Sequence, residues 1–247
     1  MADADGFLDG GLRLRQPTRG HRAGTDAILL AASLDAREGH LIDAGAGVGA
    51  AGLALATRAP GLAVTLVEID PATAALAREN IALNGMGDRV RVAEGDFLSA
   101  AGRRATGLAD RSADFVVTTP PWLTPGRSRA SPDARRALAH VLGPGGLDGW
   151  MRAVAALLKP GGRLATIVRA EDLTELLAAC SGRFGDLAIR PAHPRAGEAA
   201  IRLLATGRKG SRATPRLLPG LVLHEADGSF TPLAAAIHRG EATLFEA

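Results

Sequence analysis

Short apolar runs alternate with longer Ala- and Leu-rich segments along most of the chain. The short runs predict strands and the longer ones helices. Strands are expected at 41–45, 63–68, 89–93, 114–118, 163–168, 187–190, 199–206 and 221–224. Helices are expected at 27–32, 49–59, 71–84, 147–158, 171–181 and 231–239, with a loop or short helix in 100–112. This alternation predicts a parallel-rich α/β sheet with helices on both faces.

The first residues differ from this pattern. Gly10 to Pro17 is polar with alternating leucines, which favours a short strand or hairpin that ends at the proline. Thr25 or Asp26 is a suitable N-cap for the helix that follows. We therefore expect residues 1–35 to form a segment and helix leading into one domain, residues 36–247.

Glycines at alternate positions follow the first of the expected long strands, in Asp43-Ala44-Gly45-Ala46-Gly47-Val48-Gly49. Glycine lets a backbone turn tightly and approach a ligand, and a helix N-terminus favours negative groups. Glu68 ends the next strand, 19 residues after Gly49, close to the spacing of about 20 for an acid that binds ribose hydroxyls. The pattern indicates an adenosine-type cofactor. The alternative is a structural turn without a ligand.

Two further motifs follow strand ends. Asp96 comes directly after Gly95 and is suited to accept a hydrogen bond from an adenine amino group, or to form a turn or helix cap. Thr119-Pro120-Pro121-Trp122 follows the strand at 114–118. In parallel sheets ligands bind beyond the carboxyl ends of the strands, so these motifs should meet Asp43 and Glu68 there.

The proline pair helps to distinguish between possible reactions. Prolines hold the preceding carbonyl oxygens in place as free acceptors, and Trp122 offers a flat face for a base. Acceptors beside an aromatic ring suit a planar substrate that carries an NH₂ group. A nicotinamide oxidoreductase needs neither feature, and a structural Pro-Pro turn with a buried Trp122 is the other alternative.

Composition narrows the class of protein. The chain has 247 residues, 47% of them hydrophobic, and no apolar run reaches the ~20 residues of a membrane span. The acidic N-terminus is unlike a signal peptide, and the single cysteine excludes an internal disulfide. The six histidines have no metal-ligand spacing. These features favour a soluble cytoplasmic protein without a membrane or metal partner.

Charge is unevenly distributed although the net charge is only +3. Between residues 183 and 216 there are eight basic and two acidic residues, and between 123 and 148 four arginines and two aspartates. Such asymmetry is typical of a nucleic-acid-binding face. The alternative is an ordinary solvated surface.

Taken together, the motifs resemble class I S-adenosylmethionine-dependent methyltransferases. More narrowly, the chain is similar to the bacterial family that includes tRNA(Val) adenine-N6 methyltransferases. The resemblance rests on Arg22-Ala23-Gly24-Thr25-Asp26, the glycine turn, Val67-Glu68-Ile69-Asp70, Gly95-Asp96, Thr119-Pro120-Pro121-Trp122 and Leu158-Lys159-Pro160-Gly161-Gly162. It implies a Rossmann-like fold with a seven-stranded, mostly parallel sheet, S-adenosylmethionine as cofactor, and RNA, most naturally tRNA, as partner of a monomer or homodimer.

The resemblance also implies roles for matching residues. Glu68 would bind the ribose hydroxyls, and Asp96 would fix the adenine. The remaining cofactor-binding residues would be Gly24, Thr25, Asp43, Gly45, Gly47, Ile69, Phe97 and Thr119. The catalytic residues, which would hold the target base, would be Thr119, Pro120, Pro121 and Trp122.

Thr119 departs from the family pattern, which has Asn, Asp or Ser where an amino nitrogen is methylated. Its hydroxyl accepts a hydrogen bond, but the side chain is shorter than Asn and β-branched. Three readings stay open beside transfer to an RNA amino group: methylation of a protein glutamine, methylation of a small molecule, and RNA binding without catalysis.

Overall fold

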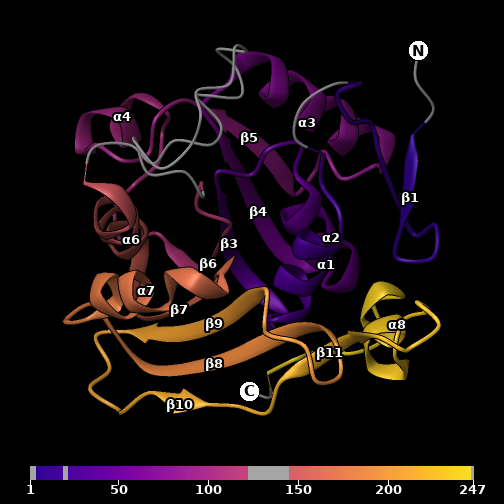
Figure 1. Cartoon of the computed structure of the whole chain (residues 1–247). Coiled ribbons are helices and arrows are strands. Elements are labelled where there is room, and N and C mark those ends of the chain that lie inside the picture. Colours follow the sequence, from indigo (N-terminus) through magenta and orange to yellow (C-terminus); the bar gives the residue numbers. More distant parts are fainter. Residues whose placement is uncertain (1–3, 19–21, 122–144, 246–247) are drawn as a thin grey trace.

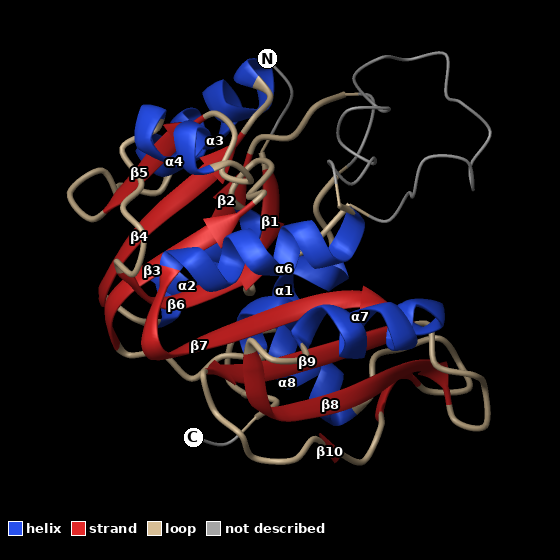
Figure 2. Ribbon diagram, turned by 90° about the vertical axis from the view of Figure 1, so that its left-hand side faces the viewer, coloured by secondary structure: helices blue, strands red, loops and turns tan. Residues whose placement is uncertain are grey.

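The structure, a computed structural model, describes residues 4–18, 22–121 and 145–245. Within these residues a sheet of nine strands runs through the molecule, with helices on both sides (Figures 1 and 2). Its strands are β3 (Glu38–Ala44), β4 (Gly61–Glu68), β5 (Val90–Glu94), β6 (Ala113–Thr118), β7 (Leu158–Arg169), β8 (Phe184–Arg195), β9 (Arg202–Lys209), β10 (Arg216–Leu217) and β11 (Leu221–His224). The expected α/β class is confirmed.

Among the described strands, seven form the order β8-β9-β7-β6-β3-β4-β5. β9 is antiparallel to β7 and β8, and the other neighbouring pairs in this order are parallel. This is the seven-stranded, mostly parallel sheet that the resemblance implies. β10 and β11 extend it, because each pairs with β8. The sequence indicated β11 but not β10, whose two residues are too few to show a pattern.

The helices divide between the two faces. One core cluster joins the sheet to α1 (Thr25–Ala32), α2 (Ala50–Arg58), α3 (Pro71–Leu83) and α8 (Pro232–His238). A second joins its other face to α6 (Gly146–Leu157) and α7 (Leu173–Cys180), which follows the 3-10 turn η1 (Ala170–Asp172). The open segment 100–112 contains the short helix α4 (Ala100–Ala105). Helix α3 begins as expected, with Pro71 in its first turn and the Asp70 side chain as its cap.

The N-terminal residues form a hairpin, β1 (Asp5–Phe7) and β2 (Leu12–Leu14), which begins earlier than expected (Figure 1). Two side-chain amides, one in α3 and one at its C-cap, hold the chain beside it. Asn80 bonds to the backbone N–H and C=O of Arg15 at 2.7 and 3.0 Å, and Asn84 does the same for Arg13 at 3.0 and 2.7 Å. Residues before and after position 35 share one core cluster. The division of the chain at residue 35 stays a prediction.

The capping prediction for α1 is wrong. Gly24 is the N-cap, and Thr25 is already the first helical residue. No side chain caps the helix, because the N-cap residue is a glycine; the Asp26 carboxylate, inside the first turn, forms an ion pair with Arg202, 3.0 Å from Nε. An acid that looks like a cap in sequence is used for a contact with a distant strand.

Candidate functional site

The carboxyl ends of β3 and β6 lie side by side, and the chain leaves them towards opposite faces. Ala44 and Thr118, the last residues of the two strands, are register partners. After β3 the chain forms α2 on one face, and the helix reached after β6, α6, packs on the other. In an open α/β sheet this reversal creates the crevice where ligands bind. The expected site therefore lies at this switch point.

The turn after β3 requires its glycines. Gly45, Gly47 and Gly49 have φ values of +77°, +59° and +91°, which only glycine adopts readily. The N–H groups of Gly45 and Ala46 both donate to the carbonyl oxygen of Val67, at 3.0 and 2.8 Å. Among the described residues, no atom beyond the chain neighbours lies within 4 Å of the place where a Cβ on Gly47 would be. The turn is thus anchored to β4 and open at Gly47.

Asp43 lies beneath α2, with 3% of its surface exposed. Its Oδ2 accepts a hydrogen bond of 2.8 Å from the N–H of Gly52, in the first turn of α2. Burial raises the pKa of Asp43 to about 7; the hydrogen bond from Gly52 opposes this shift, and the charge of Glu68 adds to it. Asp43 therefore fixes the start of α2 and changes charge near neutral pH. Its expected contact with the methionine part of the cofactor stays a prediction.

Glu68 ends β4 facing the glycine turn. Its Oε2 accepts from the N–H of Gly47 at 2.9 Å, and its Oε1 from the N–H of Asp70 at 2.8 Å. Burial raises the pKa of Glu68, and these backbone bonds oppose that shift. Each oxygen keeps a lone pair for a further donor. Beside it Ile69 is 50% exposed, an apolar side chain left open to a ligand.

The segment after β5 lies beside the end of β4. The N–H of Gly95 donates to the carbonyl oxygen of Glu68 at 2.8 Å, which places Asp96 beside the end of β4. Asp96 Oδ1 accepts from the N–H of Leu98 at 2.7 Å. Phe97 is 5% exposed and belongs to the core. The adenine contacts expected of Asp96 and Phe97 stay predictions. The Phe97 ring itself lies in the core.

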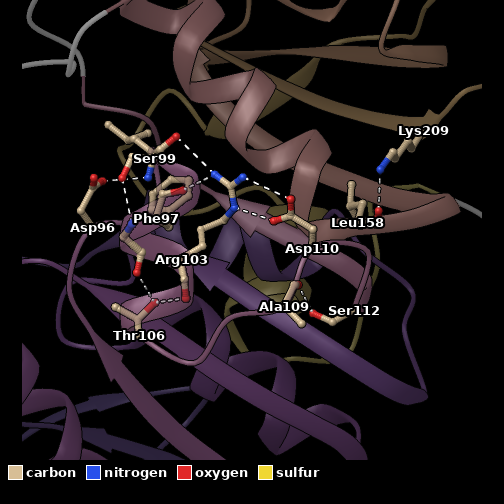
Figure 3. A network of polar contacts seen from close by, with 12 residues as sticks. Asp96, Phe97, Ser99, Arg103, Thr106, Ala109, Asp110, Ser112, Leu158 and Lys209 are labelled. Carbon is tan, nitrogen blue, oxygen red and sulfur yellow. Dashed lines mark hydrogen bonds and ion pairs between the residues drawn. The ribbon is translucent and has the colours of Figure 1, made fainter.

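A buried arginine binds the backbone of the segment after β5 (Figure 3). Arg103, from α4, is 6% exposed and donates from Nη1 to the carbonyl oxygens of Phe97 and Leu98 at 3.0 and 3.3 Å. Its Nε and Nη2 donate to Asp110, at 2.7 and 3.4 Å. This role was not predictable from the sequence, because Arg103 is one of several arginines in a segment without a clear pattern.

The turn after β6 begins at the switch point. Thr119 is half-buried, Pro120 is buried and Pro121 is half-buried, whereas Trp122 lies outside the described residues. Directly before them, the Thr118 hydroxyl donates to the carbonyl oxygen of Ala44 at 2.7 Å. It accepts a hydrogen bond of 2.9 Å from Nε1 of Trp150, in α6. Sequence reasoning missed Thr118 and Trp150, and the only available signal was a second tryptophan in an apolar helix.

Comparison with known proteins agrees with this geometry. The sequence model of the methyltransferase small domain family matches residues 22–146. A tRNA1(Val) (adenine(37)-N6)-methyltransferase from Porphyromonas gingivalis is 31% identical over 219 residues, which are 85% of this chain and 84% of that protein. The chain belongs to the methyltransferase small domain family. It is an S-adenosylmethionine-dependent methyltransferase, as the resemblance implied.

Two other relatives of this methyltransferase differ in their named acceptor. A solved structure of a predicted O-methyltransferase from Agrobacterium tumefaciens is 35% identical, covers 89% of this chain and 98% of that one, and has a TM-score of 0.75. A release factor glutamine methyltransferase from Moorella thermoacetica is 35% identical over 139 residues, 53% of this chain and 47% of that protein. The names of these relatives therefore indicate different acceptors.

Gly24 and Thr25 have different neighbours from Glu68. They line a cavity of about 540 Å³ between the β1–β2 turn, α1 and α8. The Thr25 hydroxyl is 3.4 Å from Nε2 of His238. Figure 1 shows the hairpin and α8 on the same side of the molecule. The cofactor-binding role expected of Gly24 and Thr25 stays a prediction.

The basic residues of the C-terminal region of this methyltransferase do not form one face. Arg202 lies opposite Arg169 at the carboxyl end of β7, whereas Arg208 lies opposite Arg163, six residues back along the same strand. Four of the eight cations form ion pairs with acidic residues: Arg183, Arg195, Arg202 and Arg216. A count along the sequence therefore overstates the basic surface near the crevice.

In the described part of the chain, no group of three or more His, Cys, Asp or Glu side chains is arranged to hold a metal ion. Nor is any described helix long and apolar enough to cross a membrane.

Proposed function

We propose that this methyltransferase transfers a methyl group from S-adenosylmethionine to the exocyclic N6 of an adenine in tRNA, in the cytoplasm. The observation that carries the proposal is the match, over 85% of this chain and 84% of the relative, to a tRNA1(Val) (adenine(37)-N6)-methyltransferase. The position of Thr119 and Pro120 at the switch point supports it, because these residues bring hydrogen-bond acceptors to the crevice.

The residues around the crevice fit the cofactor. Glu68 is already oriented by two backbone N–H groups and keeps acceptor capacity for the two ribose hydroxyls. Ile69 is half exposed and offers apolar surface to the adenine. Gly47 leaves open space next to Glu68. When bound, S-adenosylmethionine supplies a methyl group on a positively charged sulfur, which makes that methyl a strong electrophile.

Thr119 and Pro120 would prepare the acceptor nitrogen. An exocyclic amine is a poor nucleophile because its lone pair is delocalised into the ring. Hydrogen bonds from its two N–H groups to the Thr119 hydroxyl and the Pro120 carbonyl favour a tetrahedral nitrogen with its lone pair towards the methyl group. With the cofactor bound, Thr119 and Pro120 would hold this nitrogen for in-line attack on the methyl group, and solvent would take the proton that the nitrogen loses. The protein contributes chiefly by positioning.

The test is transfer of labelled methyl to unmodified bulk tRNA, followed by mass spectrometry of the nucleosides. We expect N6-methyladenosine. A ribose-methylated nucleoside would replace the proposal with O-methylation, the activity named for the Agrobacterium relative. Failure to label RNA, together with labelling of a glutamine-containing release-factor peptide, would favour the activity named for the Moorella relative. RNA binding without any transfer would indicate a non-catalytic role.

A further inference from the structure

Trp150 contacts three segments at once: the end of β6, the turn after β3 and the segment after β5. Its Nε1 donates to the Thr118 hydroxyl at 2.9 Å. Its Cζ2 and Cη2 lie 3.1 and 3.2 Å from the place where a Cβ on Gly45 would be. Its ring meets that of Phe97 edge-on, with centroids 4.8 Å apart. Trp150 is only 7% exposed, so packing fixes all three contacts.

The Thr118 hydroxyl joins the two strands where they part. It donates to the carbonyl oxygen of Ala44 at 2.7 Å while it accepts from Trp150. Ala44 directly precedes Gly45 of the cofactor-side turn, and Thr118 directly precedes Thr119 of the acceptor-side turn. This side-chain bond therefore adds to the backbone ladder of β3 and β6 at their last register pair, directly before the two turns.

We propose that Trp150 and Thr118 are positioning residues for methyl transfer, which set the distance between the turn at Gly45 and the turn at Thr119. The proposal rests on the proposed function, since it takes Thr119 and Pro120 as the acceptor-binding turn. Both residues act through others: Trp150 through Gly45 and Phe97, and Thr118 through Thr119. In-line transfer is sensitive to such placement, because an error of about 1 Å can cost about 10²-fold in rate.

The chain offers a matched control. Thr166 in β7 is the register partner of Thr118, and both residues are 0% exposed. The Thr166 hydroxyl has no hydrogen-bond partner among the described residues. Thr118→Val and Thr166→Val thus make the same isosteric change at neighbouring buried sites, and only the first breaks a hydrogen-bonded link.

The first measurement is kcat for tRNA methylation, with binding of S-adenosylhomocysteine by calorimetry. We expect Thr118→Val to lower kcat about 30-fold or more while the Kd changes less than about threefold. Thr118→Ser should restore most of the activity, and Thr166→Val should stay within about twofold of the wild type. Losses in Trp150→Phe and Thr118→Val should not add in the double variant, because both break one link. Equal kcat values for Thr118→Val and Thr166→Val, or additive losses, would overturn the proposal.

A second measurement does not depend on the acceptor. The chain has two tryptophans, so Trp122→Phe leaves Trp150 as the sole indole. Saturating S-adenosylhomocysteine should then change the emission of Trp150, and adding Thr118→Val but not Thr166→Val should reduce that change at least about twofold, because the link to the turn is lost. Unchanged emission despite calorimetric binding overturns the proposal. The expected emission change in Trp122→Phe, together with a wild-type enzyme that labels no tRNA, shows instead that the proposed acceptor is wrong.

Discussion

The N–H of Gly47 donates to Oε2 of Glu68 at 2.9 Å, and so joins the turn after β3 to the end of β4. The other carboxylate oxygen is held by the N–H of Asp70 at 2.8 Å. Both oxygens are therefore oriented by backbone donors before any ribose arrives. Such preorganisation lowers the entropy cost of binding, because no side chain has to be ordered by the ligand.

Removing the Glu68 carboxylate should weaken cofactor binding severely. We expect Glu68→Ala to raise the Kd of S-adenosylhomocysteine about 100-fold, since two hydrogen bonds to a charged group are lost at about 1.5 kcal/mol or more each. Calorimetric titration measures this. Glu79→Ala is the control, because Glu79 is half exposed on α3 and pairs only with Arg15 among the described contacts. Similar Kd values for the two variants would contradict the assignment of Glu68.

The raised pKa of Asp43 predicts two opposite responses to pH. The folded protein keeps a proton on Asp43 up to a pKa of about 7, whereas the unfolded chain loses it near the ordinary value of 3.8. The contribution of Asp43 to stability therefore falls as pH rises from about 4 to 7. Cofactor affinity should rise between about pH 6 and 8, because the ionised carboxylate attracts the cationic cofactor.

Asp43→Asn separates these responses from those of other groups. The amide oxygen can still accept from Gly52, but it cannot ionise. We expect both pH dependences to become flatter in urea unfolding and in calorimetry. Identical pH profiles for the variant and the wild type would show that Asp43 does not titrate in this range.

The exposed side chain of Ile69 should contribute to affinity rather than to stability. Ile69 is 50% exposed beside Glu68, so truncation removes apolar surface that a bound adenine would cover. We expect Ile69→Ala to weaken cofactor binding roughly fivefold to tenfold with little change in unfolding free energy. Leu217→Ala is the control, at a site 74% exposed on β10. Equal binding by both variants would remove Ile69 from the adenine site.

Thr119 should limit the rate of transfer. In the proposed function its hydroxyl, directly after β6, accepts from the substrate amine, so Thr119→Ala should lower kcat about 10²-fold. Thr119→Asn brings a longer acceptor and should raise kcat above that of the wild type. A transfer rate that is unaffected by Thr119→Ala would show that the acceptor does not bind at this turn.

Local patterns predicted most of the fold. The strands around the glycine turn and the Pro71 start of α3 follow from apolar runs and turn residues close together in sequence. β8 was expected only at 187–190 but extends from Phe184 to Arg195, because its ladder with β9 continues through Pro191, opposite Leu203. A proline lacks an N–H and so looks like a strand end when its partner strand is unknown.

The positions of Asp43 and Glu68 beside the glycine turn were predictable, because each residue lies at the end of a strand that the apolar runs indicate. The site was not predictable where a role arises from contacts between distant segments. Trp150 contacts Thr118 and Gly45 only because α6 packs over the switch point. Arg103 contacts Phe97 only because α4 folds back on the segment after β5. Arg202 likewise forms an ion pair with Asp26, so the basic residues of the 183–216 stretch serve different purposes.

The most direct test of the central claim compares two transcripts of a tRNA that differ at one base, with adenine or guanine at position 37, the position in the name of the Porphyromonas relative. The account predicts incorporation of one methyl group into the adenine transcript, recovered as N6-methyladenosine, and none into the guanine transcript. Equal labelling of both, or recovery of a ribose-methylated nucleoside, would contradict it.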